Sequence, residues 1–219
     1  KRTIDTLHKL GFNQLHLRLT DDQVFNVRLE STPELAFSLM HQHKVYSVQD
    51  LRTIVLYAKK RNIIIMPEID IPGHAASWRN VPGMVVDCPK FTCERFFGVP
   101  LNINNMAHQK AGLAVIRKIL TEIVNIFERP PFLHLGGDEV HVGDDCLLEA
   151  GVTSNYSAFE SELAQIVQNI GYRDDQIVRW ETTGQQKLTR SRSIVHFWSS
   201  QDFRRHSLIN LGSPHEAFT

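Results

Sequence analysis

The sequence predicts an α/β fold built around a parallel β-sheet, of the (β/α)8 TIM barrel class. Apolar strand candidates alternate with amphipathic helical segments, and this alternation favours parallel strands joined by right-handed helical crossovers. Polar residues gather directly after several strand candidates, at the end where such barrels carry their chemistry. The chain of 219 residues holds six strand candidates, whereas a closed barrel has eight strands in about 250 residues. We therefore expect a single domain over residues 1–219, an incomplete barrel without the first strand and the last part.

The composition is that of an ordinary soluble globular domain. Hydrophobic residues make up 42% of the chain, and 24 basic side chains balance 24 acidic ones. Because no basic block or basic helical face stands out, we expect no nucleic-acid partner. No apolar run reaches the roughly 18 residues that a membrane span requires. A doubly wound open sheet is the alternative fold, although the sequence has no glycine-rich phosphate loop such as GxGxxG.

The first elements are a helix and a strand. Apolar residues recur at helical spacing over residues 1–10, and Gly11 stands where a helix C-cap would. Residues 13–19 alternate between polar and apolar, which predicts a strand. The residues from there to about Lys44 are polar and irregular.

A second helix is expected to begin after Ser47, because Ser47 and Asp50 resemble a capping box. Apolar residues recur at helical spacing up to Ala58. The β-branched run of residues 62–66 is typical of a parallel strand covered on both faces. A loop of about 30 residues follows, and loops of that length are usually functional or disordered.

The remaining elements continue the alternation. A wide apolar stripe predicts a helix over residues 107–127, and residues 132–135 are typical of a short buried strand. Another helix is expected over residues 156–170. The last strand candidates, of which the first two end in tryptophan, are residues 176–180, 193–198 and 207–211.

The chain has three cysteines, Cys88, Cys93 and Cys146, and no CxxC or Cys/His metal spacing. Free buried thiols are the default interpretation. Because Cys146 lies in a different loop from the other two, a bridge between the loops is the alternative for a secreted or lysosomal protein.

Two adjacent acids, Asp138 and Glu139, follow the central strand candidate in the segment FLHLGGDEV. Two glycines precede them, and glycine permits a close backbone approach that a side chain would block. Buried carboxylates cost free energy unless they are paired or hydrogen-bonded. A solvated acidic turn is the plain interpretation of such a pair, but other strand ends in this chain carry similar polar residues.

Each strand candidate contributes polar or aromatic residues at the same end. Because parallel strands align their carboxyl ends, these residues are expected to share one site. Tryptophans at successive strand ends could belong to the core, but above acids they also suit the walls of a sugar pocket. The residues are Asp21, Asp22, Asp70, His74, Asp138, Glu139, Trp180 and Trp198.

The adjacent acids indicate a particular kind of glycoside hydrolysis. Most glycosidases place two carboxylates on opposite sides of the scissile bond, about 5–5.5 Å apart or further. Asp138 and Glu139 are sequence neighbours and are badly placed to flank one bond. They favour a scheme in which one acid is the proton donor and the substrate's own 2-acetamido group is the nucleophile.

Three motifs, LRLTDDQ, MPEIDIPGHA and HLGGDEV, carry a family resemblance in their order and spacing. Over nearly its whole length the chain resembles the catalytic domain of β-N-acetylhexosaminidases, glycoside hydrolase family 20. The resemblance implies a (β/α)8 barrel that removes terminal β-linked GlcNAc or GalNAc with retention and uses no cofactor or metal. It also implies glycans, glycoproteins or chitooligosaccharides as substrates, a homodimer as a partner state, and a lysosomal or secreted location.

The resemblance assigns a role to each matching residue. Glu139 would be the general acid/base, and Asp138 would hold the acetamido nitrogen while its oxygen attacks the anomeric carbon. Asp21 and His74 would form a hydrogen-bonded relay to Glu139. The residues expected to contact the substrate are Trp180, Trp198 and Asp70.

The sequence departs from the family pattern at Arg18. The family usually has His-Trp-His where this chain has His16-Leu17-Arg18, so this corner of the pocket is expected to be altered. The family's substrate-binding arginine, the Tyr-Leu-Asp motif, the last wall tryptophan and a sugar-binding glutamate belong to segments that we do not find in this chain.

Two other functions compete with the glycosidase. A degenerate relative that binds N-acetylhexosamine without turnover is suggested by Arg18 and the missing segments. A metal-dependent barrel hydrolase would use His16, Asp70, His74 and His134, although Arg18 removes the obvious His-x-His pair.

Overall fold

The computed structural model describes residues 1–36, 45–86, 98–103, 106–140, 152–181 and 193–197. Its main feature is a sheet of five strands in which every pair of neighbours is parallel. The strands, given in sheet order, are β1 (Gln14–Arg18), β4 (Ile64–Glu68), β5 (Leu133–His134), β6 (Ile177–Trp180) and β7 (Ile194–His196). The parallel sheet predicted from the sequence is confirmed.

The order of the strands separates the two fold alternatives. A doubly wound sheet reverses its strand order at a switch point, whereas here the neighbours follow chain order from β1 to β7. A sheet whose strands follow one another in chain order is typical of the (β/α)8 barrel. The doubly wound alternative is therefore wrong for this sheet. The last strand candidate, residues 207–211, lies outside the described residues.

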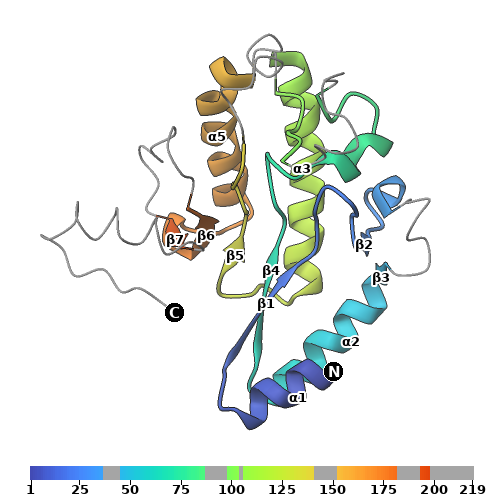
Figure 1. Cartoon of the computed structure of the whole chain (residues 1–219), viewed down its shortest axis with the longest axis vertical. Helices are drawn as coiled ribbons and strands as arrows, with labels where there is room; N and C mark the ends of the chain where they lie inside the picture. The colour runs from blue at the N-terminus through green and yellow to red at the C-terminus, as the bar shows by residue number, and fades with distance from the viewer. Residues whose placement is uncertain (37–44, 87–97, 104–105, 141–151, 182–192, 198–219) are drawn as a thin grey trace, which may run out of the picture.

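Helices connect the strands and cover one side of the sheet. Helices α3 and α5 lie side by side along it, and α2 contacts both β4 and α3 (Figure 1). The helices are α1 (Arg2–Lys9), α2 (Val48–Lys59), α3 (Met106–Ile126) and α5 (Val152–Asn169), with 3₁₀ turns η1 (Pro33–Ala36), η2 (Ala76–Asn80) and η4 (Asp174–Gln176). The capping box predicted for α2 is confirmed, because the Ser47 hydroxyl accepts from Asp50 N–H and the Asp50 carboxylate accepts from Ser47 N–H.

The two faces of the sheet differ in chemistry. Leu15 and Leu17 of β1 pack against the hydrophobic core, in which α3 and α5 bury residues such as Ile116, Ile119 and Leu163. Side chains alternate along a strand, so the opposite face of β1 presents His16 and Arg18. The register places these two opposite Met66 and Glu68 of β4. This polar face leads to the candidate site.

Two local expectations need correction. The strand expected over residues 62–66 is β4, Ile64–Glu68, because Ile63 N–H still donates to Ala58 O and closes α2. Asn62 has a φ of +55°, which turns the chain before the strand begins. The segment expected to be irregular contains a short strand, β2 (Val27–Arg28), which pairs in parallel with β3 (Tyr46–Ser47) just after it.

Candidate active site

Two loops, one after β4 and one after β5, meet at the carboxyl ends of the strands. A Cβ added to Gly73 would lie 2.7 Å from Asp138 O, and one added to Gly136 would lie 1.8 Å from Asp70 Oδ1. Gly73 thus packs on the backbone of Asp138 and Gly136 packs on the Asp70 carboxylate, and glycine is required at both contacts. This packing brings His74 to the two acids that follow Gly137.

The contact at Gly136 leads to a stability prediction. Gly136 has a φ of +62° and no room for a side chain, whereas Gly83 has a φ of +77° and nothing within 4 Å of an added Cβ. Gly83→Ala should lower the free energy of unfolding by about 1–2 kcal/mol, the cost of a left-handed backbone. Gly136→Ala should lower the free energy of unfolding by clearly more than this in urea unfolding. Equal losses in the two variants would contradict the close contact.

His74 links two carboxylates in a relay. Its Nδ1 lies 3.1 Å from Asp21 Oδ1 and its Nε2 lies 3.0 Å from Glu139 Oε2. The ring is largely buried, with 6% of its side chain exposed, whereas Glu139 is 22% exposed. Both His74 and Glu139 have positive φ, +50° and +53°, a region that is uncommon for non-glycine residues. The structure thus brings together Asp21, His74 and Glu139.

The surroundings of His74 favour its charged form. Burial lowers the pKa of the imidazole, but hydrogen bonds to Asp21 and Asp22 and the charges of Asp70 and Asp138 outweigh burial and raise it to about 11. Burial raises the pKa of Asp21, whereas the hydrogen bond from His74 and the charge of Arg18 lower it, and the net shift is downward. His74 therefore donates from both nitrogens, one to Asp21 and one to Glu139.

The raised pKa of His74 predicts how stability depends on pH. A folded-state pKa above the unfolded value of 6.5 adds stability that is full below pH 6.5 and is lost as pH rises toward 11. His74→Asn, in which asparagine tolerates the positive φ, should remove this loss. Urea unfolding between pH 6 and pH 10 should show a steeper decline for the wild type than for the variant. Parallel declines would contradict a charged His74.

Asp138 presents an acceptor without a partner. Its Oδ1 is buried and has no hydrogen-bond donor among the described residues, while its Oδ2 lies 3.7 Å from His74 Nε2. A buried carboxylate oxygen left without a donor costs free energy. This oxygen therefore suits a ligand that brings an N–H or O–H group to the side of Glu139.

Arg18 lies among carboxylates from neighbouring strands. Its Nη2 donates to Asp70 Oδ2 at 2.7 Å, its Nη1 to Glu68 Oε1 at 3.3 Å, and its Nε lies 3.3 Å from Asp21 Oδ2. The altered corner expected from the sequence is thus filled by a guanidinium paired with acids. Glu68, which is 0% exposed, was missed at the sequence level. Its position two residues before Asp70 was the available signal.

Asp70 lies behind the site rather than on its surface. The residue is 0% exposed, and its Oδ1 accepts from Gly137 N–H at 2.8 Å. Burial and the charge of Asp138 raise the pKa of Asp70, and Arg18 opposes them. A carboxylate in this position supports the glycine turn, so the predicted direct contact between Asp70 and a sugar does not fit its burial.

Trp180 is anchored at one edge and lies against two histidine rings. Its Nε1 donates to Glu68 Oε1 at 2.8 Å, and the ring lies 4.6 Å from the His134 ring and 4.3 Å from the His196 ring, between centroids. The tryptophan remains partly exposed beside the acids. The second predicted wall, Trp198, and all three cysteines lie outside the described residues.

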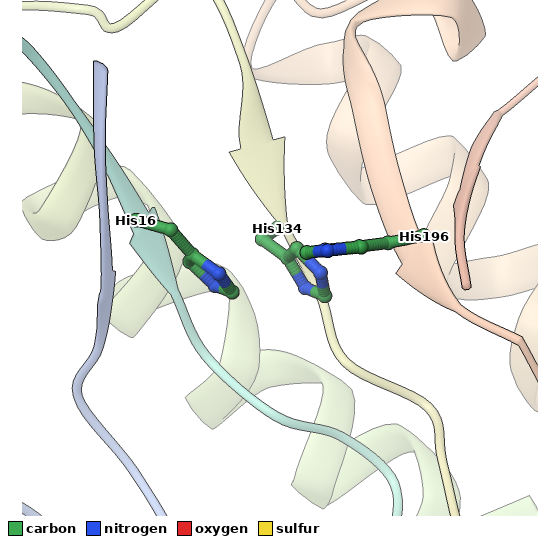
Figure 2. A group of neighbouring side chains, drawn as sticks. All are labelled: His16, His134 and His196. Carbon is green, nitrogen blue, oxygen red and sulfur yellow. The ribbon is translucent and has the colours of Figure 1, made fainter. Parts of the chain in front are cut away.

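Three histidines gather on the polar face of the sheet, and Figure 2 shows His134 between His16 and His196. Their nitrogens lie within 4.8 Å of one another, but the rings of His16 and His134 are stacked 4.6 Å apart at 16°. A ring nitrogen binds a metal in its own plane, so two stacked rings cannot share one ion. Gly136 N–H also donates to His134 Nδ1, while burial and the neighbouring imidazoles lower the pKa of His134 to about 2.

The four residues that the sequence suggested for a metal site fall into two separate groups. His16 and His134 belong with His196, whereas Asp70 and His74 lie with Asp138. The four residues named for a metal hydrolase therefore do not form one cluster. Histidines packed around Trp180 fit a structural layer under the site.

Comparison with known proteins identifies the family. The sequence model of the glycosyl hydrolase family 20 catalytic domain matches residues 1–213. Together with the parallel sheet and the strand-end acids, this match places the chain in a family of glycosyl hydrolases. The chain belongs to glycosyl hydrolase family 20, as the motifs predicted.

Similar proteins and structures agree with this assignment. The chain is 34% identical to beta-hexosaminidase subunit A1 of Dictyostelium discoideum over 154 residues, 70% of this chain and 27% of that protein. It is 29% identical to beta-hexosaminidase A of Caenorhabditis elegans, over 90% of this chain and 38% of that protein. The chain thus spans well under half of these relatives.

Solved structures support the fold. Flavobacterium johnsoniae chitobiase matches with a TM-score of 0.70 at 23% identity, covering 92% of this chain and 31% of that chain. An exo beta-N-acetylglucosaminidase from Vibrio harveyi, solved in complex with N-acetylglucosamine, matches with a TM-score of 0.69 at 21% identity, covering 94% of this chain and 36% of that chain.

The helices in the described part of the chain include none with the length and apolar character of a membrane span.

Proposed function

We propose that the protein hydrolyses terminal non-reducing β-linked N-acetylhexosamine from glycans, with retention and with the 2-acetamido group as nucleophile. One observation carries this proposal: the relay from Asp21 through His74 ends on Glu139, beside a buried oxygen of Asp138 that has no donor among the described residues. The site thus offers one proton donor and one acceptor for a substrate N–H.

In the first step, Glu139 donates a proton to the glycosidic oxygen. The bond from that oxygen to the anomeric carbon breaks, and the acetamido oxygen bonds to the same carbon to give an oxazolinium ion. The proton that Glu139 donates reaches its carboxylate from His74 Nε2, and His74 becomes neutral while its Nδ1–H stays on Asp21. In the second step, water attacks the anomeric carbon and the bond from that carbon to the acetamido oxygen breaks, which restores the acetamido group. Glu139 takes a proton from this water and returns a proton to His74.

Asp138 stabilises the charge that develops on the substrate. Its Oδ1 accepts from the acetamido N–H, which satisfies the buried oxygen and aims the acetamido carbonyl at the anomeric carbon. The negative carboxylate also opposes the positive charge of the oxazolinium ion. Fixed charge of this kind is among the largest contributions to catalysis in a water-poor site.

The other described carboxylates near Glu139 already have partners. Asp22 accepts from Ala76 and Gly98 N–H groups, and Asp70 and Glu68 pair with Arg18. None of them is available in the described chain as an enzyme nucleophile on the opposite side of the bond. This favours the substrate-assisted route, which the family's exceptions to the two-carboxylate scheme use.

The substrate is proposed to lie against Trp180 and Trp198, with glycoproteins or chitooligosaccharides as natural sources of the sugar. The Vibrio harveyi structure with bound N-acetylglucosamine supports this class of ligand. We also propose that residues 1–219 form part of one (β/α)8 barrel. A homodimer and a lysosomal or secreted location stay predictions from the family.

The test compares two substrates that differ in one group. The complete protein should cleave an aryl N-acetyl-β-glucosaminide and should leave the aryl β-glucoside essentially intact, because the latter lacks the acetamido nucleophile. Cleavage of both at similar rates would contradict the proposal. A folded protein that binds an N-acetylglucosamine thiazoline and cleaves neither substrate would favour the non-catalytic binding relative instead.

A further inference from the structure

One cation connects the catalytic relay, the glycine turn and the wall tryptophan. Each of the three nitrogens of Arg18 lies within 3.3 Å of an acid, and these acids follow or end different strands, Asp21 after β1 and Glu68 and Asp70 at β4. Each acid in turn holds a separate part of the site. Arg18 itself is 28% exposed along its side chain, so solvent screens it only in part.

The first of these links runs through Asp70 to the acids. The Asp70 carboxylate bonds Arg18 with one oxygen and Gly137 N–H with the other. Gly137 directly precedes Asp138 and Glu139, and Gly136 packs against Asp70 with no room for a Cβ. A displaced Asp70 would therefore move the turn that presents both acids.

The other two links connect Arg18 to His74 of the relay and to Trp180. Asp21 contacts Arg18 with Oδ2 and His74 with Oδ1, so one carboxylate connects the guanidinium and the imidazole. Glu68 Oε1 is shared between Arg18 Nη1 and Trp180 Nε1. A planar guanidinium can hold several oxygens at fixed angles, which an ammonium group cannot do.

We propose that Arg18 is a positioning residue of this active site, which holds Asp21, Glu68 and Asp70 so that the relay, the glycine turn and Trp180 keep their catalytic arrangement. The inference rests on the proposed function and adds a role that the family resemblance does not supply, because the family usually has histidine here. Arg18 is not a binding site for an acidic substrate, since all three of its nitrogens already have acid partners.

The positive charge of Arg18 predicts an effect on the pH dependence of kcat/KM that packing alone would not produce. The groups that face Asp21 are Arg18, His74 and the adjacent Asp22, and Arg18 lowers the pKa of Asp21. Without the guanidinium, Asp21 would take up a proton at higher pH and would stop stabilising the charged His74. The acid limb of the pH profile of kcat/KM should then move to higher pH.

The kinetic test uses three variants of the complete protein. Arg18→Met should lower kcat by about 100-fold, the loss expected from a small misplacement of catalytic groups, and should move the acid limb upward. Arg18→Lys keeps the positive charge but lacks the planar guanidinium. Its acid limb should therefore stay near the wild-type position while kcat still falls. Arg117→Met, on the exposed side of α3, should match the wild type. An Arg18→Met profile that superimposes on the wild type would overturn the proposal.

Crystal structures provide a test that does not depend on activity. In Arg18→Met, the hydrogen bond from Gly137 N–H to Asp70 should be lost and the Gly136–Gly137 turn displaced. An unchanged turn would overturn the positioning role even if kcat fell. If the wild-type protein cleaves no N-acetylhexosaminide, the proposed function fails, and the turn in the variant structure still decides the role of Arg18.

Discussion

Glu139→Gln is expected to lower kcat by roughly 10²–10⁴-fold, the usual contribution of a general acid. Glutamine has the shape of glutamate, and its carbonyl oxygen can still accept from His74 Nε2, so the fold and the relay geometry should survive. It cannot release a proton to the glycosidic oxygen. The loss should be largest for substrates with poor leaving groups, because an activated aryl group departs with little protonation.

The measurement is kcat for two aryl N-acetyl-β-glucosaminides whose leaving groups differ in pKa. The matched control is Glu162→Gln, an exposed position on α5, which should match the wild type. Equal losses with both leaving groups would contradict proton donation by Glu139. Full activity in Glu139→Gln would remove the residue from the mechanism.

Asp138→Ala should have the second largest effect, with kcat lowered by about 10²–10³-fold, as when one preorganised group is removed from an active site. Without the carboxylate, the acetamido N–H loses its acceptor and the oxazolinium ion loses its opposing charge. Asp138→Asn keeps an acceptor oxygen without the charge and should retain more activity than alanine.

Comparing kcat of the two variants separates the effect of the Asp138 charge from that of its hydrogen bond. Asp175→Asn, in an exposed pair with Arg173 away from the acids, serves as the control for a lost surface carboxylate. If asparagine and alanine lower kcat equally, the charge carries the effect and the hydrogen bond contributes little. Wild-type kcat in Asp138→Ala would contradict the proposed role of this residue.

The sequence predicted the parts of the fold that depend on local patterns. The capping box at Ser47 and the alternation of strands with helices are set by residues close in the chain. The Gly-Gly turn before Asp138 and the PGH segment at His74 were also visible, because tight turns require particular residue types. These features placed the relay residues on neighbouring strand ends before the structure was known.

The contacts around Arg18 could not be predicted in the same way. Arg18 and Asp70 are 52 positions apart, and their meeting depends on the register that pairs Arg18 with Glu68. A shift of one residue would turn Arg18 to the other face of the sheet. The sequence therefore marked Arg18 as a departure from the family pattern but did not show which acids it joins.

Strand β4 begins later than the sequence predicts for a similar reason. A β-branched run predicts a strand, but the closing turn of α2 holds Ile63 N–H and delays the strand by two residues. The burial of Asp70 follows from the approach of Gly136, a contact between two loops. Such contacts are set by tertiary packing, which local propensity does not encode.

The most direct measurement of the proposed chemistry is kcat/KM for aryl β-glucosaminides whose N-acetyl group carries zero, one, two or three fluorines. Fluorine withdraws electrons from the carbonyl oxygen and weakens it as a nucleophile. If that oxygen attacks the anomeric carbon, kcat/KM should fall steeply with each fluorine in the wild-type enzyme. A rate that does not change across the series would contradict substrate assistance and would require a nucleophile from the protein.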